Sequence, residues 1–250
     1  MVEEPLPPTP NEDEIKRFDY CGNVDLHAID GNPNLNSVVA VAGEHGFRGI
    51  VVQPSRLEDL VAAINKPNFG DKEITAICAI DYPFGVSSMG VRNYMLHDAK
   101  EKGAHEVEVV IPYHWVLDKD WKRLYDDAQS LVAISNKLDL SIKYVIDQNA
   151  SNIDDTVSAR LCRIIASTRM PIVSTSLGFF DDSKISHADQ VIKMRNLKSK
   201  AGCAVKVYVR NPSVEVISGF SRGGCDVFGV TWSVAANIVH SYENLLNNQE

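Results

Sequence analysis

The sequence predicts an α/β protein with a single closed (β/α)8 TIM barrel, and three observations support this fold class. The chain has 250 residues, a length that such barrels commonly use for one domain. Short β-branched segments alternate with longer segments of helical periodicity. This alternation repeats eight times, the number at which a parallel sheet closes on itself. A doubly wound open sheet is the main alternative, but no Gly-x-Gly-x-x-Gly motif follows the first strand.

The eight expected strands are short runs rich in valine, isoleucine and other apolar residues. In chain order they are Cys21–His27, Gly49–Pro54, Ile74–Asp81, Glu106–Pro112, Ser141–Asp147, Met170–Ser176, Ala204–Val209 and Asp226–Thr231. A segment with apolar residues at three- and four-residue spacing follows each strand, which predicts a helix. These helices are Leu35–His45, Leu57–Ile64, Val91–Lys102, Trp121–Leu138, Asp154–Ser167, Ala188–Lys200, Val214–Phe220 and Val234–Leu246.

The start of the chain, MVEEPLPPTPNEDEIKRF, is acidic and rich in proline. A secretory signal has the opposite character, with a basic start and an apolar segment. No apolar run approaches the ~20 residues needed to cross a bilayer. We therefore predict a flexible tail over residues 1–18, a barrel over residues 19–250 and a cytoplasmic location.

Charge and cysteine content exclude several classes of partner and site. With 25 Lys and Arg against 33 Asp and Glu, the net charge is −8, which disfavours nucleic acid and anionic membranes. The five cysteines are odd in number and show no Cys-x-x-Cys spacing, so we expect reduced, mostly buried thiols and no metal site. The Gly223-Gly224 pair could bind an anion, but a helix stop is the favoured interpretation.

Charged residues stand in strands that a parallel barrel buries. They are Asp25, Glu108, Lys143, Asp147 and Lys206. A lone buried charge is costly, so these carboxylates and amines are expected to neutralise one another in one cluster. They are either structural ion pairs or an active site, where a lysine of lowered pKa attacks a carbonyl and a carboxylate moves protons. For the five residues together, we favour a present or former active site.

From about Asp25 onward, the order of motifs resembles the deoxyribose-phosphate aldolase family. The similarity is closest through CAIDYPFG, AKEKGAHEVEVVIPY, SIKYVID, IVSTSLGF, VKV and VFGVT. The resemblance implies a (β/α)8 class I aldolase that needs no metal or other cofactor. In such an enzyme a lysine forms a Schiff base with acetaldehyde, and the enamine adds to glyceraldehyde 3-phosphate.

The resemblance transfers a remnant of the catalytic cluster to this chain. Asp25 and Lys143 fall on the family's first-strand aspartate and fifth-strand lysine. Lys206 falls on the seventh-strand lysine that tunes the Schiff-base lysine. Glu108 stands where the family has an aspartate, so its carboxylate lies one methylene further out, a displacement that catalytic geometry tolerates poorly.

The position of the nucleophile departs from the family pattern. The family has a lysine followed by Thr-Ser-Thr-Gly at the sixth strand, whereas this chain reads MPIVSTSLGF. Val173 or Ser174 therefore takes the place of the lysine. Neither side chain can form an imine, so the family chemistry is expected to fail at its first step.

Two features of the family's phosphate site are also altered. The Pro-x-Gly-Gly turn after the seventh strand is replaced by VKVYVRNP, which has no glycine to let the backbone approach a phosphate. The Gly-x-Ser-Ser of the last strand becomes Gly229-Val-Thr-Trp, and Trp232 is expected to fill the pocket. The remnant of the phosphate site consists of Ser176, Gly178, Gly229 and Thr231.

These three changes favour a pseudoenzyme that binds a protein or a small regulator. The partner is unknown; a cytoskeletal protein is suggested by analogy with other aldolases, and a homodimer is compatible with the sequence. One alternative is an active lyase that cleaves 2-deoxyribose 5-phosphate to glyceraldehyde 3-phosphate and acetaldehyde through Lys206 or Lys143. Another is a different enzyme in which Glu108, Asp147 and Lys206 transfer protons to an unphosphorylated substrate.

Overall fold

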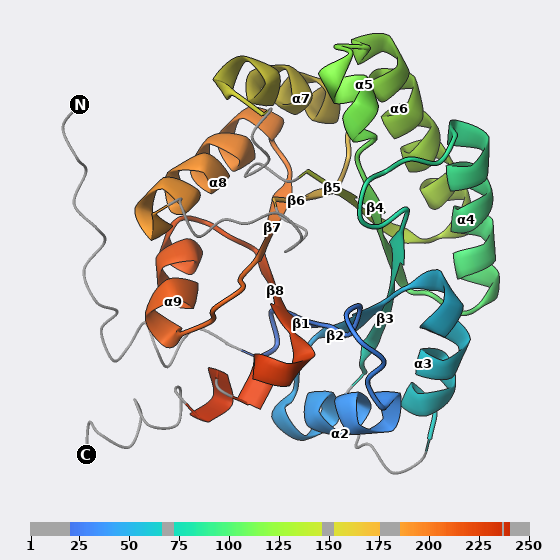
Figure 1. Ribbon diagram of the computed structural model, residues 1–250, viewed down its shortest axis with the longest axis vertical. Coiled ribbons are helices and arrows are strands. Elements are labelled where there is room, and N and C mark those ends of the chain that lie inside the picture. Colours follow the sequence, from blue (N-terminus) through green and yellow to red (C-terminus); the bar gives the residue numbers. More distant parts are fainter. Residues whose placement is uncertain (1–20, 67–72, 147–152, 176–185, 237, 241–250) are drawn as a thin grey trace.

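A computed structural model describes residues 21–66, 73–146, 153–175, 186–236 and 238–240 of the chain (Figure 1). Its strands pair in parallel in the order β1-β2-β3-β4-β5-β6-β7-β8 and close into a barrel. Helices surround this barrel on the outside (Figure 1). The predicted (β/α)8 fold is therefore confirmed, while the predicted tail over residues 1–18 lies outside the described ranges.

Each strand lies within a segment predicted as a strand but is shorter by at least one residue. The strands are β1 (Val24–His27), β2 (Gly49–Val52), β3 (Thr75–Ile80), β4 (Glu106–Val110), β5 (Ser141–Val145), β6 (Ile172–Ser174), β7 (Ala204–Tyr208) and β8 (Val227–Thr231). After β2, for example, the strand stops at Val52 and Pro54 begins a short 3-10 helix. The apolar sequence pattern therefore extends beyond the residues that hydrogen-bond to a neighbouring strand.

Where both ends of a predicted helix are described, the helix begins and ends within two residues of the predicted limits. They are α2 (Leu35–His45), α3 (Leu57–Ile64), α4 (Met89–Glu101), α5 (Tyr113–Leu117), α6 (Trp121–Leu138), α7 (Asp155–Thr168), α8 (His187–Ala201) and α9 (Val214–Arg222). Two 3-10 helices cover Pro54–Arg56 and Trp232–Val234. Helix α5 was not predicted, because five residues are too few to show a 3.6-residue period. The predicted helix Val234–Leu246 lies partly outside the described residues.

Local capping explains why the helices start and stop where they do. Ser88, Asp154 and Ser186 each accept a hydrogen bond from a backbone N–H in the first turn of the helix that follows. Helix α9 ends at Arg222 and is capped by Gly223, so the helix-stop interpretation of the glycine pair is confirmed. None of the helices in the described part of the chain is long and apolar enough to cross a membrane.

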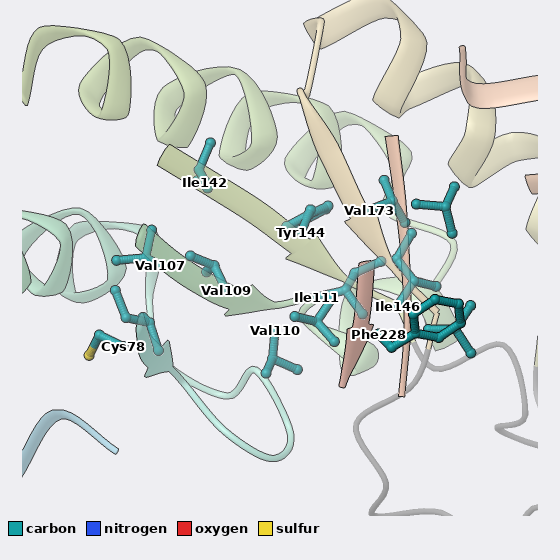
Figure 2. Packing of buried hydrophobic residues seen from close by; sticks show 14 of the residues in the cluster. Cys78, Val107, Val109, Val110, Ile111, Ile142, Tyr144, Ile146, Val173 and Phe228 are labelled. Carbon is teal, nitrogen blue, oxygen red and sulfur yellow. The ribbon is translucent and has the colours of Figure 1, made fainter. Parts of the chain in front are cut away.

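Strand alternation separates two regions of the barrel. Tyr144 and Val173 belong to the row that packs between the strands and the helices, together with residues such as Cys78, Val107 and Ile142 (Figure 2). A smaller apolar group inside the barrel contains Val51, Ile77 and Ala79. The remaining inward positions include charged residues. None of the five cysteines forms a disulfide, and three of them are buried.

A second buried ionic group fixes the helices on one side of the barrel. Arg92 of α4 is fully buried and binds Asp127 of α6 through two hydrogen bonds of 3.0 and 2.9 Å. The same guanidinium donates to Asp81 Oδ2 at 2.9 Å and to the carbonyl oxygen of Val110 at 2.7 Å. Tyr144 donates its hydroxyl to Asp127 at 3.1 Å. This group connects α4 and α6 to the ends of β3 and β4.

We predict that Arg92→Ala lowers the free energy of unfolding by about 3–5 kcal/mol, because it leaves two buried carboxylates without their cation. Arg123→Ala is the matched control, since the Arg123 side chain is 67% exposed in an i,i+3 pair with Asp120 and is expected to contribute below about 1 kcal/mol. Urea unfolding at pH 7 measures both. Equal losses in the two variants would show that the buried group does not stabilise the fold.

Candidate functional site

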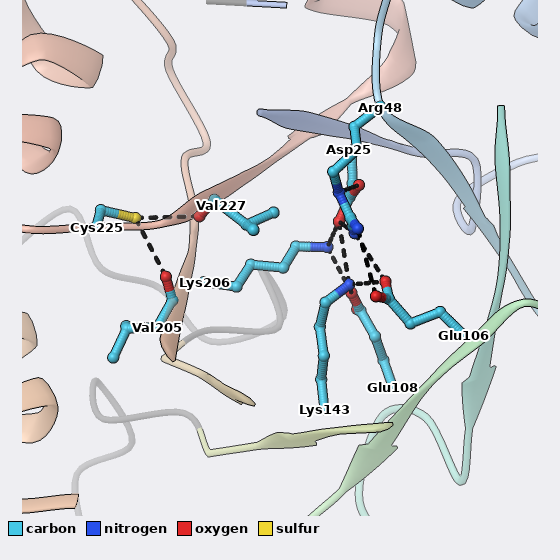
Figure 3. A network of polar contacts seen from close by, with 9 residues as sticks. All are labelled: Asp25, Arg48, Glu106, Glu108, Lys143, Val205, Lys206, Cys225 and Val227. Carbon is cyan, nitrogen blue, oxygen red and sulfur yellow. Dashed lines mark hydrogen bonds and ion pairs between the residues drawn. The ribbon is translucent and has the colours of Figure 1, made fainter. Parts of the chain in front are cut away.

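Six charged side chains meet inside the barrel, and we call them the interior charge cluster (Figure 3). They are Asp25 of β1, Arg48 before β2, Glu106 and Glu108 of β4, Lys143 of β5 and Lys206 of β7. Three are cations and three are anions, so the cluster has no net formal charge. The structure thus brings together four of the five charged strand residues predicted from the sequence. The fifth, Asp147, lies outside the described residues.

Asp25 makes contacts with all three cations of the cluster. Arg48 donates to its Oδ1 and Oδ2 at 2.7 and 2.8 Å, and Lys206 and Lys143 donate to Oδ2 at 2.8 and 3.2 Å. The Asp25 side chain is fully buried. Burial raises its pKa, but the charges of Lys143, Lys206 and Arg48 outweigh burial and hold the pKa well below its usual range. Asp25 is therefore an anion at neutral pH.

Lys143 is surrounded by carboxylates. Its amine donates to Asp25, to Glu106, and to Glu108 at 3.3 Å. Burial lowers the pKa of Lys143, but the three carboxylates outweigh burial and raise that pKa above its usual value. These surroundings of Lys143 correspond to the alternative of structural ion pairs, because carboxylates rather than cations are its nearest charges.

Lys206 lies between two carboxylates. Its amine donates to Asp25 at 2.8 Å and to Glu108 at 2.5 Å. Burial raises the pKa of Glu108, but Lys206 and Lys143 outweigh it and bring the pKa to about 2. The longer side chain of Glu108 thus reaches both amines and forms ion pairs with them.

Arg48 and Glu106 belong to the cluster but were not predicted from the sequence. Arg48 binds the Glu106 carboxylate at 2.7 Å, in addition to Asp25. Burial raises the pKa of Glu106, but Lys143 and Arg48 outweigh it and lower the pKa. Strand alternation could have identified Glu106, because it lies two residues before Glu108 and so faces the same side. Arg48 lies in a turn, where no periodicity marks the direction of a side chain.

The register of β6 decides which of the two candidate replacements faces the interior. Ser174 pairs with Val145 on one side and with Lys206 on the other, so it belongs to the same inward row as Lys206. Val173 belongs to the apolar core outside the barrel. Ser174 is therefore the inward residue at the carboxyl end of β6, where its side chain is buried.

His27 is a further interior residue whose importance the sequence did not indicate. It lies at the end of β1, and its ring contacts that of Tyr208 edge-on, with centroids 5.0 Å apart. A Cβ atom on Gly229 would lie 2.6 Å from His27 Nε2 and 2.8 Å from Lys206 Cε. The absence of a side chain at Gly229 therefore makes room for His27 and Lys206. Burial, followed by the charge of Lys206, lowers the pKa of His27 to about 3.

The predicted phosphate remnant is described only in part. Ser176 and Gly178 lie outside the described residues. The side chains of His27 and Lys206 occupy the space beside Gly229. The hydroxyl oxygens of Thr231 and Tyr208 are 2.5 Å apart and form a hydrogen bond. Trp232 is partly buried against the core and opens the 3-10 helix after β8. The two described residues of the predicted phosphate site, Gly229 and Thr231, thus contact other side chains of the protein.

A small cavity lies at the carboxyl ends of four strands, the location where (β/α)8 enzymes bind their substrates. Its lining residues are His27, Ile29, Ala79, Tyr82, Glu108, Val110 and Val145. Its volume of about 10 Å³ is at the lower limit for one water molecule. Burial raises the pKa of Tyr82 at this cavity to about 12. Within the described residues, no group of three or more His, Cys, Asp or Glu side chains could hold a metal ion.

Comparisons with known proteins identify one group of relatives, although no protein-family model matches the chain. A deoxyribose-phosphate aldolase of Clostridium perfringens is 29% identical over 202 residues, which cover 81% of this chain and 85% of the relative. A deoxyribose-phosphate aldolase of Streptococcus suis is 25% identical over 221 residues, covering 88% and 95%. The solved tetrameric deoxyribose phosphate aldolase of Aeropyrum pernix has the same fold, with a TM-score of 0.74, 19% identity and coverage of 94% and 100%.

We predict that the buried neutral His27 makes the protein less stable as the pH falls from about 6.5 towards about 3. The pKa of His27 is lower in the folded protein than in the unfolded chain, so on acidification the unfolded chain binds a proton first. The stabilisation that is present above pH 6.5 is therefore lost as the pH falls. Between pH 6.5 and pH 5 the expected loss is about 2 kcal/mol in urea unfolding.

His27→Gln removes this titration, so its stability should change less over the same interval. His97→Gln, at an exposed position, is the matched control and should behave like the unmodified protein. If His27→Gln and His97→Gln gave parallel curves, the ring of His27 would not be held neutral in the folded state.

Proposed function

Because this chain belongs to the deoxyribose-phosphate aldolase family, we propose that it is an aldolase-derived barrel without aldol cleavage activity that serves as a protein-binding or regulatory scaffold. The reaction that the relatives' name implies cleaves 2-deoxyribose 5-phosphate to glyceraldehyde 3-phosphate and acetaldehyde. A class I aldolase carries it out through an imine between the substrate and a lysine. The proposal therefore depends on which nitrogen atoms the barrel interior offers to a carbonyl carbon.

The observation that carries the proposal is the hydroxyl of Ser174 at the inward end of β6. The IVSTSLGF motif offers Val173 or Ser174 as the counterpart of the family's nucleophilic lysine, and Ser174 is the one of the two that faces inward. Ser174 pairs in register with Lys206, the counterpart of the lysine that assists the nucleophile. A hydroxyl can add to a carbonyl, but it cannot go on to an imine, because no nitrogen is present to take up the double bond.

The ion pairs of the remaining amines argue against a relocated nucleophile. An amine attacks a carbonyl only when it is unprotonated, and the pKa of Lys143 is raised by its three carboxylates. Lys206 is held between the carboxylates of Asp25 and Glu108. An attack of this amine on a carbonyl carbon would break both of these buried ion pairs, which is costly in a dry interior.

Among the described residues, side chains of the protein itself occupy part of the barrel mouth. The cavity that they leave beside Glu108 and His27 has a volume of about 10 Å³. The rings of His27 and Tyr208 and the hydroxyl of Thr231 contact one another near the carboxyl ends of β1, β7 and β8. A stable barrel with this interior can still present its outer surface to a partner.

We expect no trapped imine on Lys143 or Lys206 when the protein is treated with acetaldehyde and borohydride and the peptides are mapped by mass spectrometry. Ser174→Lys restores an amine next to the cation of Lys206, which lowers the pKa of a neighbouring lysine, so an adduct at position 174 is expected in that variant. Ser174→Met, of similar bulk and without an amine, is its control.

An adduct on Lys143 or Lys206 of the unmodified protein that is abolished by Lys143→Met or Lys206→Met would contradict this proposal. It would instead support a lyase that uses a relocated lysine.

The scaffold role is tested separately by affinity capture of the tagged full chain from its native lysate. A stoichiometric protein partner is the expected result. A thermal-shift response to a small metabolite alone would instead indicate a regulator or substrate that enters the barrel.

A further inference from the structure

A cavity on the outside of the barrel lies between α2 and α3, two helices that pack against each other (Figure 1). We call it the α2–α3 groove. Its polar lining, with one small residue of α3, consists of Asn34, Asn36, Arg56, Asp59, Ala62 and Lys66. The remaining lining residues are apolar. The groove shares no lining residue with the cavity at the barrel mouth, so the two are separate sites.

The α2–α3 groove has the size of a site for a small organic molecule. Its volume of about 350 Å³ falls within the range of about 300–1,000 Å³ that such sites enclose. At roughly 30 Å³ for each water-sized group, it has space for a ligand of about ten non-hydrogen atoms. The small side chain of Ala62 leaves part of this space open, and a larger residue there would occupy it.

Arg56 approaches the groove from the short 3-10 helix after β2 and is held in place by hydrogen bonds. Its Nε donates to Asp59 at 3.3 Å, its Nη1 donates to Asn32, and its Nη2 donates to the carbonyl oxygen of Pro33 at 3.3 Å. A guanidinium has five N–H groups, and no described residue accepts a hydrogen bond from the other two. Arg56 therefore presents donors to a ligand in a fixed orientation.

Lys66 approaches the groove from the other end of α3. Its ammonium donates to Asn36 Oδ1 at 2.7 Å, which connects it to the first turn of α2. The backbone N–H of Asn36 in turn donates to the side chain of the capping residue Asn34 at 3.0 Å. Arg56 and Lys66 thus both bind the segment that begins α2. Two cations from opposite ends of α3 therefore converge on one groove.

The groove is positively charged, although the protein as a whole is negatively charged. Arg56 and Lys66 against Asp59 give the lining a formal charge of +1, whereas the chain carries −8. The first turn of α2 contains no acidic residue, so no carboxylate of that turn neutralises the positive end of the helix dipole. An anionic group is therefore favoured in the groove, and the apolar part of the lining can contact the body of the same ligand.

A small anion fits this surface better than a polyanion does. Nucleic acid is bound through a series of cations that follow its backbone. Next to the groove, the first turn of α3 instead exposes the carboxylates of Glu58 and Asp59. The positive charge is thus confined to the groove itself.

We propose that the α2–α3 groove binds a small organic anion, with a single carboxylate or phosphate group on Arg56 and Lys66 and an apolar body against Ala62. The two cations would supply charge-assisted hydrogen bonds to the anionic group. The inference goes beyond the scaffold role and does not rest on it. The groove is formed by outer helices, so it would be the same in an active lyase and in an inactive barrel.

The test uses benzoate and phenyl phosphate as probes and benzyl alcohol as their uncharged counterpart. Each is titrated into the ¹⁵N-labelled full chain at constant ionic strength and followed by NMR. Saturable shifts at Asn36, Arg56 and Ala62 are expected with at least one of the two anions, with a Kd on the order of 1 mM for ligands of this size. Benzyl alcohol is expected to bind at least about 10-fold more weakly, because it lacks the charge-assisted bonds. A preference between the two anions identifies the anionic group as carboxylate or phosphate.

Variants locate the binding. Arg56→Gln and Lys66→Gln each remove a cation and should weaken binding of the preferred anion at least about 10-fold. Ala62→Leu keeps every charge but fills part of the groove, and it should weaken binding to a similar extent. Lys122→Gln is the matched control, because it removes an 83% exposed cation from α6, and it should bind as the unmodified protein does.

Circular dichroism and urea unfolding establish that each variant is folded; if Arg56→Gln is not, Lys66→Gln and Ala62→Leu carry the test. The proposal is overturned if neither anion gives saturable shifts, or if benzyl alcohol binds equally well. Unchanged binding in Ala62→Leu, or an equal loss in Lys122→Gln, would also contradict it. Neither probe can form an imine with a lysine, so these outcomes are independent of the presence or absence of aldol cleavage.

Discussion

The interior charge cluster is the constraint on which the rest of this barrel depends. Six charges share a volume from which water is largely excluded, and they are tolerated because each has an opposite charge within hydrogen-bonding distance. Asp25 is central, since it is the only member that contacts Arg48, Lys143 and Lys206. The strands that carry these residues must keep their register for the pairs to form. The cluster therefore specifies strand alignment as well as charge balance.

The same ion pairs limit the chemistry that the interior can perform. A nucleophilic lysine requires surroundings that favour its neutral form, such as an apolar pocket or a neighbouring cation. The carboxylates around Lys143 have the opposite effect and stabilise the ammonium form. The three cations of the cluster are balanced by its three carboxylates, and their ion pairs connect β1, β4, β5 and β7 across the barrel interior.

Much of this architecture was predictable from the sequence, because strands and helices leave periodic signals of known length. All eight strands and the limits of α2, α3 and α6 follow from those signals. Four charged strand residues were recognised as one cluster because charge is rare in buried parallel strands. Arg48 was missed since its direction is set by a turn, and His27 because a histidine at a strand end fits many environments. The choice between Val173 and Ser174 needed the register of β6, which depends on its neighbours along the barrel.

The shared space around Gly229 has a consequence for substitutions on β8. His27 and Lys206 occupy the volume that a side chain at position 229 would need, so any residue larger than glycine there requires a change at position 27 or a displaced Lys206 as well. A larger residue at position 229 alone would therefore disturb the ion pairs of Lys206 with Asp25 and Glu108, which lie far from it in the sequence. One glycine on the last strand thus preserves contacts made by the first, fourth and seventh strands.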